Sequence, residues 1–213
     1  LLDPQLNRNY SMSYLFSYGP FSHTGIKADI TPSDHVGFML GISNPTDMAF
    51  ANFEKKFFLA QFHAATADGK LSGYLNYVGG KTQADDASNQ IDLVLTGAVS
   101  DKFSIGYNGS LKSVKPAGGD ANSWWGSALY LNADPSSTVG LTLRGEYFDD
   151  KKSVAGFGTS FFETTLSVDV KIDQLTIIPE FRLDNAKDPV FTKNSGATAK
   201  SSASFLLAAI YSF

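Results

Sequence analysis

The chain has 213 residues, of which 43% are hydrophobic and 18% charged, with a formal net charge of −4 and no cysteine. The charged fraction is below the ~25% of an average soluble domain, and the negative net charge argues against a nucleic-acid partner, which requires a basic surface. No run approaches the ~20 consecutive apolar residues of a transmembrane helix, and the first residues lack the charged and apolar regions of a signal peptide.

Nearly every segment alternates between apolar and polar residues with a period of two, the period of a β-strand. In residues 139–148, for example, an apolar face opposes one that carries Arg144 and Glu146. Each predicted strand has roughly ten residues, close to the ~9–11 that a tilted strand needs to cross a bilayer, whereas strands of soluble proteins are nearer ~5–6. In chain order the predicted strands are 21–31, 35–44, 55–66, 70–79, 89–99, 102–113, 122–132, 136–148, 159–172, 174–184 and 203–213.

Short and long connections alternate between these strands. Turn-forming residues predict tight turns near 31–34, 67–69, 100–101, 133–136 and 173–174. Longer links lie near 44–54, 80–88, 114–121, 149–158 and 185–202. Outer-membrane barrels have this asymmetry, with short periplasmic turns and longer outer loops. The pattern therefore predicts an all-β fold, an antiparallel up-and-down transmembrane β-barrel over residues 21–213.

The last predicted strand alternates apolar residues up to the terminal Phe213. A soluble protein rarely ends in this way, because a terminal carboxylate prefers water and a frayed end buries little. The ending resembles the signal that the barrel assembly machinery of the outer membrane reads. We therefore expect this machinery and the outer-membrane lipid as partners.

Aromatic residues gather near the ends of the predicted strands. Rings at such positions in membrane barrels lie between the lipid and its headgroups, although for any single ring ordinary core packing is the alternative. The residues predicted at the membrane interface are Tyr77, Trp124, Trp125, Tyr147, Tyr211 and Phe213.

If lipid surrounds the barrel, the polar strand faces must point into the lumen, because hydrocarbon cannot satisfy their hydrogen bonds. Pairs across neighbouring strands, such as Glu146 with Lys171 or Arg182 with a nearby acid, would either brace a solvated wall or form an eyelet for polar solutes. Acids and cations balance, so little charge preference is expected. The predicted pore-lining residues are Lys27, Asp29, His63, Asp92, Lys102, Lys112, Arg144, Glu146, Glu163, Asp169, Lys171, Glu180 and Arg182.

Five stretches carry a resemblance to a known family: Asn9–Phe16, Gly19–Ala28, Leu75–Gly80, Arg144–Asp150 and Ile178–Arg182. They are similar to β-barrel porins of the OmpL-like group, which are common in the Bacteroidetes, and the resemblance spans essentially the whole chain. It implies a channel in the outer membrane of a Gram-negative bacterium. Members are usually longer, with a signal peptide and further strands before the Asn9–Phe16 stretch. The chain is thus expected to be the C-terminal two-thirds of such a protein, and its 11–12 strands part of a larger barrel.

Residues 1–20 precede the first predicted strand. A closed bacterial barrel usually has an even number of strands, so either an upward strand is missing or residues 10–18 form a twelfth. We expect residues 1–20 to be a loop or partial strand at the barrel mouth, or to fold inward and narrow it.

These features predict a porin that passes small polar solutes by passive diffusion with weak charge preference. A barrel extended by further strands approaches the ~16–18 strands that enclose an aqueous channel. The alternative is a structural or partner barrel of a larger outer-membrane complex without an open pore. Homo-oligomers and contacts with other envelope proteins fit both interpretations.

An enzyme is not expected, because barrel hydrolases position a Ser or Asp beside a His, and His23, His35 and His63 are scattered. Their spacing also predicts no metal site, and no cofactor is expected. A soluble β-sandwich would have to bury the apolar faces against a second sheet. That fold does not explain the strand length, the loop asymmetry and the terminal Phe together.

Overall fold

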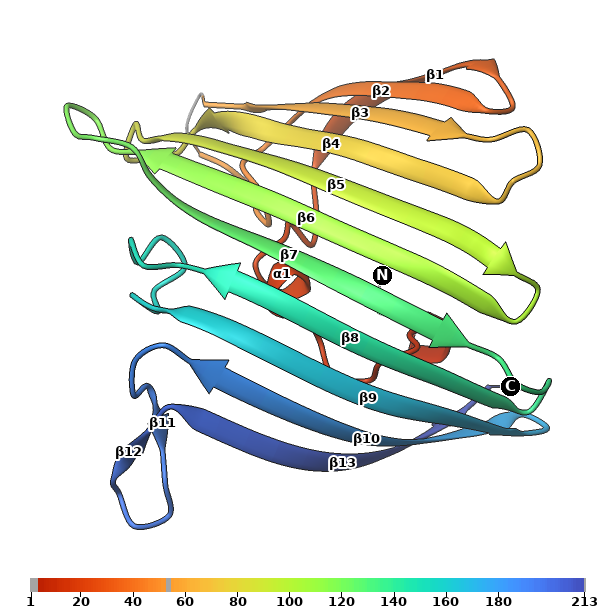
Figure 1. Cartoon of the computed structure of the whole chain (residues 1–213). Coiled ribbons are helices and arrows are strands. Elements are labelled where there is room, and N and C mark those ends of the chain that lie inside the picture. The colour runs from red at the N-terminus through yellow and green to blue at the C-terminus, as the bar shows by residue number, and fades with distance from the viewer. Residues whose placement is uncertain (1–3, 53–54, 213) are drawn as a thin grey trace.

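The computed structural model describes residues 4–52 and 55–212. Its main feature is an 11-stranded antiparallel sheet in which each strand pairs with the next along the chain (Figure 1). The strands are β1 (Gly25–Ser33), β2 (Val36–Ser43), β3 (Phe57–Ala65), β4 (Leu71–Lys81), β5 (Ala87–Ser100), β6 (Phe103–Lys115), β7 (Asn122–Ala133), β8 (Val139–Asp149), β9 (Ser160–Ile172), β10 (Leu175–Ala186) and β13 (Ser201–Tyr211). The prediction of an up-and-down antiparallel fold is confirmed.

Smaller elements lie outside this sheet. A 3-10 helix, η1 (Pro4–Leu6), and a one-turn helix, α1 (Tyr14–Ser17), precede β1. The hairpin β11 (Phe191–Thr192) and β12 (Thr198–Ala199) stands in the link between β10 and β13. In the described part of the chain, no helix has both the length and the apolar character needed to span a membrane.

The sheet is curved, and η1 and α1 lie on its concave side (Figure 1). Among the described residues, β1 and β13 are the two edges of the sheet and do not pair with each other. The described chain is therefore a trough of barrel wall with an inner, concave face and an outer, convex face.

The strand boundaries correct the sequence prediction in two places. The first strand begins at Gly25 rather than at residue 21. The predicted long link at 80–88 shrinks to residues 82–86, because β4 and β5 both extend into it, and it is no longer than the turn at 66–70. The other longer links gather at the left of Figure 1 and the short turns at the right.

The proposed twelfth strand over residues 10–18 is wrong. Tyr14–Ser17 form a helical turn, for which the Ser13 hydroxyl accepts a hydrogen bond from the backbone N–H of Phe16. A serine at this position satisfies an amide that the first turn of a helix leaves without a partner. The backbone amides of Tyr14 and Leu15 are bonded to a wall carboxylate instead of to a neighbouring strand.

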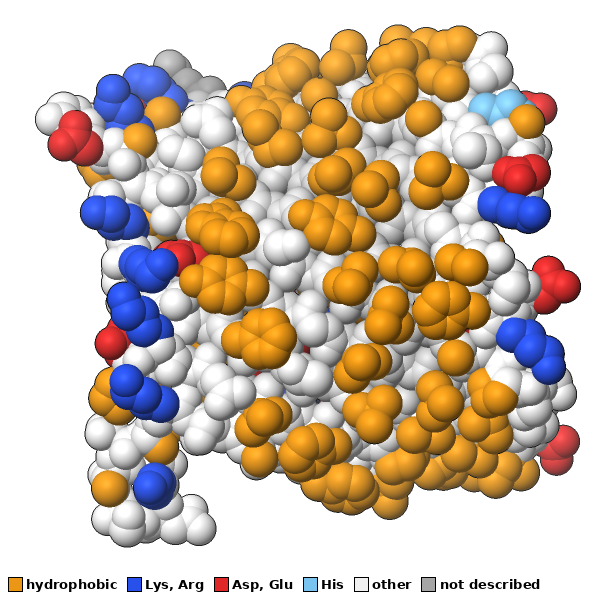
Figure 2. Space-filling model, viewed as in Figure 1, with side chains coloured by type: hydrophobic (Ala, Val, Ile, Leu, Met, Phe, Trp, Pro, Cys, Tyr) orange, Lys and Arg blue, Asp and Glu red, His pale blue; other side chains and the backbone are white. Residues whose placement is uncertain are grey.

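Strand register gives the two faces of the trough different chemistry. Large apolar side chains such as Ile26, Phe181 and Phe205 point outward and are at least half exposed. Figure 2 shows them as a broad apolar surface, with Lys, Arg, Asp and Glu gathered at the two ends of the strands. No second sheet covers this face in the described chain. An apolar band between two polar rims is the surface of a membrane barrel.

Candidate functional site on the inner face

Nearly all predicted pore-lining residues lie on the inner face of the trough. Paired residues in an antiparallel sheet share a face, so the register places each of them. On inner-face strand positions are Lys27, Asp29, His63, Asp92, Lys112, Arg144, Glu146, Glu163, Asp169, Lys171, Glu180 and Arg182. Lys102 is the exception. Because β6 begins at Phe103, Lys102 lies in the preceding turn, where its Nζ donates to the Pro135 carbonyl at 3.2 Å.

Residues 4–20, here called the inner segment, lie against the inner face of β7–β10 and bond mainly to β8–β10. The Glu146 carboxylate on β8 accepts the backbone N–H groups of Tyr14 at 2.8 Å and Leu15 at 2.7 Å. Only 1% of Glu146 is exposed. A buried carboxylate requires such donors, because burial without them is costly. The first amides of α1 therefore donate hydrogen bonds to a buried wall acid. The same acid is the acceptor that these amides would otherwise lack.

A second wall acid binds the segment in the same way. Glu180 on β10 accepts the backbone N–H groups of Tyr10 at 2.8 Å and Ser11 at 3.0 Å. It also accepts the hydroxyl of Ser167 on β9 at 2.7 Å. Two carboxylates thus hold the main chain of the inner segment at two points.

Arg144 on β8 forms a buried ion pair with Glu163 on β9. Its Nε lies 2.9 Å from Glu163 Oε2, and the two side chains are 3% and 0% exposed. The remaining guanidinium donors reach the Ser11 carbonyl at 2.8 Å and the Thr165 hydroxyl at 3.1 Å. Because a buried ion pair needs its other donors and acceptors satisfied, the inner segment completes this pair.

Arg182 on β10 reaches the segment at its middle. It donates to both oxygens of Asp184 at 2.8 Å and to the Met12 carbonyl at 2.7 Å. Its guanidinium carbon lies 5.2 Å from the ring centroid of Tyr14, within the range of a cation–π contact. The expectation that Arg182 pairs with a nearby acid agrees with this geometry.

Acidic side chains outnumber the guanidinium groups on this wall, so the wall requires hydrogen-bond donors from the inner segment. Register places Glu146, Glu163 and Asp184 opposite one another in a row across β8, β9 and β10. Like charges at directly opposed positions repel. The guanidinium groups of Arg144 and Arg182 offset part of this charge, and the backbone amides of the segment supply further donors.

The proposed pairing of Glu146 with Lys171 is wrong. Glu146 lies opposite Glu163, whereas Lys171 lies near the short-turn end of β9 opposite Thr176. The carboxylate is satisfied by main-chain amides, which sequence reasoning about charged side chains does not consider. Asp184 was also missed, although its position two residues after Arg182 places both side chains on the same face.

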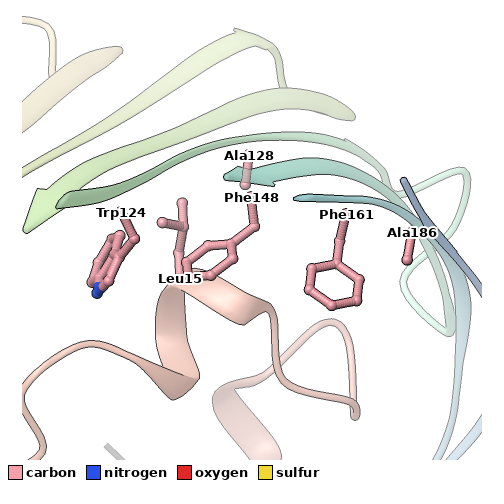
Figure 3. Close-up of a cluster of buried hydrophobic side chains, with 6 residues drawn as sticks. All are labelled: Leu15, Trp124, Ala128, Phe148, Phe161 and Ala186. Carbon is pink, nitrogen blue, oxygen red and sulfur yellow. The ribbon is translucent and has the colours of Figure 1, made fainter. Parts of the chain in front are cut away.

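An apolar cluster seals the contact between α1 and the wall (Figure 3). Its buried members are Leu15, Trp124, Ala128, Phe148, Phe161 and Ala186. Leu15 points from α1 toward the strands, where Gly126 leaves room for it, since a Cβ there would lie 2.7 Å from Leu15 Cδ2. Burying a leucine side chain contributes roughly 1.5–3 kcal/mol.

Tyr14 contacts both this cluster and the row of acids that crosses β8, β9 and β10. Its ring stacks on Phe148 and Phe161, with centroids 5.6 and 4.8 Å away, and its hydroxyl donates to Asp184 at 3.0 Å. Burial raises the pKa of the Tyr14 hydroxyl well above its ordinary value, and the neighbouring Asp184 charge raises it further. The hydroxyl is therefore a proton donor that fastens α1 to β10.

The segment is also tied to the wall near the short-turn end. Arg8 donates to both oxygens of Asp134, at 3.2 and 2.7 Å, and to the Thr142 hydroxyl at 2.9 Å. The hydrogen bonds from Arg8 lower the pKa of Asp134, which lies in the turn after β7. This pair is partly exposed.

The inner face of β3–β6 differs, because two cavities separate it from the inner segment. One, of about 380 Å³, lies between residues 6–13 and strands β5 and β6. The other, of about 430 Å³, lies beside Phe16 and Phe21 and reaches Asp92 and Gln90 on β5. A row of hydrogen bonds crosses this wall at mid-height and joins Gln61, Asn76, Asp92 and Asn108.

The predicted interfacial aromatics divide between the two faces. Tyr77, Trp125, Tyr147 and Tyr211 lie on the outer face near strand ends. Trp124 does not, since it is 1% exposed within the inner cluster. Consecutive strand residues point to opposite faces, so Trp124 and Trp125 cannot both meet lipid. Phe213 lies outside the described residues.

His63 is the predicted pore-lining residue that could also serve as a metal ligand or a catalytic base. His63 stacks on Tyr74 with ring centroids 4.4 Å apart. Residues 4–52 and 55–212 contain no group of three or more His, Asp or Glu side chains placed to hold a metal ion.

Comparisons with known proteins agree with this architecture. A family model described as "Putative beta-barrel porin-2, OmpL-like" matches residues 1–213. The crystal structure of the outer membrane channel DcaP of Acinetobacter baumannii is similar in fold, with a TM-score of 0.67 at 12% sequence identity. The similarity covers 95% of this chain and 67% of that channel. No curated protein sequence is similar to the chain.

Proposed function

Because the chain belongs to the OmpL-like family of β-barrel porins, we propose that it forms a diffusion channel for small polar solutes with weak charge preference. Its place is the outer membrane of a Gram-negative bacterium, of the kind found in the Bacteroidetes. The single observation that carries the proposal is the division of the sheet into two faces. The outer face is apolar and exposed, whereas the inner face is polar and borders open space.

The inner segment gives this channel a constriction. It occupies the inner face of β8–β10 and leaves the cavities along β3–β6. Solutes then pass between the segment and β3–β6, where the wall carries amide, hydroxyl and carboxylate groups. Weak charge preference follows, because most wall charges on β8–β10 are already bonded to one another or to the segment.

Planar-bilayer conductance of the purified full-length protein tests the function. We expect steady ionic current from the wild type, and a higher conductance after deletion of residues 9–17, which removes α1 and its contacts. A matched control replaces Phe50, a 92% exposed loop residue, by Ser and leaves the conductance unchanged. A protein that inserts but passes no current, with or without residues 9–17, would instead be a structural or partner barrel of a larger complex.

Assembly follows from the same proposal. We expect the barrel assembly machinery to recognise β13 together with the C-terminal residues up to Phe213, and outer-membrane lipid to cover the apolar face. Homo-oligomers or contacts with other envelope proteins are further partners, which cross-linking in isolated membranes would reveal.

A further inference from the structure

The open half of the inner face contains a row of polar side chains whose hydrogen-bond direction is fixed by one carboxylate. Asn76 and Asn108 each donate an amide N–H to Asp92, at 3.2 and 2.7 Å, from the two flanking strands. A carboxylate only accepts hydrogen bonds, so both amides must turn their NH₂ groups toward it. Gln61 continues the row by donating to the Asn76 oxygen at 2.7 Å.

Because the NH₂ groups are turned toward Asp92, side-chain oxygens of the row are left to accept hydrogen bonds. The Asn76 oxygen already receives the Gln61 amide. The oxygens of Gln61 and Asn108 receive no hydrogen bond from the described residues, and neither does the side-chain oxygen of Gln90 on the same wall. All of these residues line the cavity of about 430 Å³ beside Phe16. The polar part of the cavity wall therefore offers mainly acceptors, which suits a cation or a solute that carries N–H donors.

The charge of Asp92 has no ion-pair partner among the described residues. By contrast, Arg144 and Arg182 on the opposite wall are committed to buried acids. Lys112 shares the inner face but lies nearer the loop end of β6, close enough to Asp47 for the two charges to interact. His63 is occupied by its stack on Tyr74. Halfway along the open wall, the net charge that a solute meets is thus negative.

We propose that Asp92 and its amide neighbours form the contact at which the channel prefers small cations to anions of the same size. The proposal rests on the proposed channel function and refines it. The acids of β8–β10 hold the inner segment, while Asp92 faces the passing solute. A single unit charge a few ångströms from an ion in water changes its energy by about 1 kcal/mol, less with salt, so the preference is modest.

Reversal potentials across a planar bilayer with a KCl gradient test this role. We expect the wild type to favour K⁺ over Cl⁻, and Asp92→Asn to lower the permeability ratio by about two- to fivefold. Asn keeps the size of Asp and can both donate and accept, so the row can re-form. Asp92→Glu retains the charge and should keep the cation preference. Asp101→Asn removes an exposed acid from a short turn and serves as the control.

The outcomes separate the two proposals. An unchanged permeability ratio in Asp92→Asn, in a protein that conducts normally, overturns the role of Asp92 and leaves the channel intact. Absence of current in the wild type overturns the channel itself. An equal loss of preference in Asp101→Asn assigns selectivity to diffuse surface charge and also overturns the proposal. Wild-type electrophoretic mobility of unheated and heated samples shows that each variant is folded.

Discussion

The inner faces of β8–β10 and β3–β6 share one alternating pattern but differ in what covers them. On β8–β10 the inner segment reaches the wall, and Arg144, Glu146 and Glu163 are at most 2% exposed. On β3–β6 the segment stands away, and cavities reach Asp92 and Asn108. The outer faces of both regions are apolar (Figure 2).

The difference teaches that a charge pattern on a barrel wall does not reveal the role of its members. Most charges in the covered region are parts of a packed contact, in which Glu146, Glu163, Glu180 and Asp184 are matched by guanidinium or main-chain donors. Charges in the open region face space that water and solutes can enter. We therefore propose a bracing network for the covered half of the wall and an eyelet for the open half.

The largest effect is expected from breaking the buried ion pair of the covered region. Arg144→Met leaves Glu163 fully buried with only the more distant Arg182, at 3.9 Å, as a charged partner. Removing one member of a buried pair costs about 3–5 kcal/mol. We expect that loss in the free energy of unfolding, measured by urea titration in detergent micelles. Lys27→Met, which breaks an exposed pair on the edge strand β1, should cost about 1 kcal/mol or less. Equal losses would contradict the comparison.

A smaller effect should follow from weakening the apolar contact of α1. Leu15→Ala removes the side chain that fills the space above Gly126. Such a truncation of a buried leucine costs about 2–5 kcal/mol. We expect most of this loss in the free energy with which the inner segment docks on the wall. We expect a higher single-channel conductance, whereas Gln5→Ala, at an exposed position of the same segment, should not change it. If both variants behave like the wild type, α1 does not limit the current.

The phenol of Tyr14 predicts a pH dependence confined to the covered region. Its pKa is raised in the folded protein, so its contribution to docking is complete below the ordinary tyrosine pKa of about 10 and is lost as the pH rises above it. A phenolate would face the Asp184 carboxylate. Conductance of the wild type should therefore rise only as the pH is taken above about 10.

Tyr14→Phe is the matched control for that titration. It removes one hydrogen bond, worth about 1 kcal/mol, but keeps the ring that stacks on Phe148 and Phe161. Its conductance should be slightly higher than that of the wild type at neutral pH. It should not rise further at alkaline pH, because position 14 then has no phenol to ionise. A full alkaline increase in this variant would assign the effect to lysines elsewhere.

The fold could be predicted from sequence because lipid imposes a simple rule on every strand. Each side chain on the outer face of a membrane barrel must be tolerated by hydrocarbon, so the alternation is local and visible along the chain. The same rule, applied to Trp124 and Trp125, would have shown that only one faces outward. Strand ends were less certain, and Lys102 fell in a turn for that reason.

The contact between the inner segment and the wall could not be predicted in the same way. The hydrogen bond from Leu15 to Glu146 joins residues 131 positions apart. Its donor is a backbone amide, which every residue except proline carries, so no residue type marks it. The sequence predicted that residues 1–20 lie at the barrel mouth or fold inward, but not which wall they would meet.

The smallest expected effect concerns the partly exposed ion pair between Arg8 and Asp134 at the short-turn end. Arg8 and Asp134 are 33% and 43% exposed, and pairs at such positions contribute about 1 kcal/mol or less. Because Arg8 lowers the pKa of Asp134, the contribution is present above the ordinary aspartate pKa of about 4 and is lost as the pH falls through the lower folded value. Asp134→Asn should therefore lower the free energy of unfolding slightly at pH 7 and match the wild type near pH 2. Raising the salt concentration at pH 7 should also narrow the difference, since exposed charges are screened. If the difference in the free energy of unfolding persists at low pH and at high salt, Asp134 stabilises its turn rather than the inner segment.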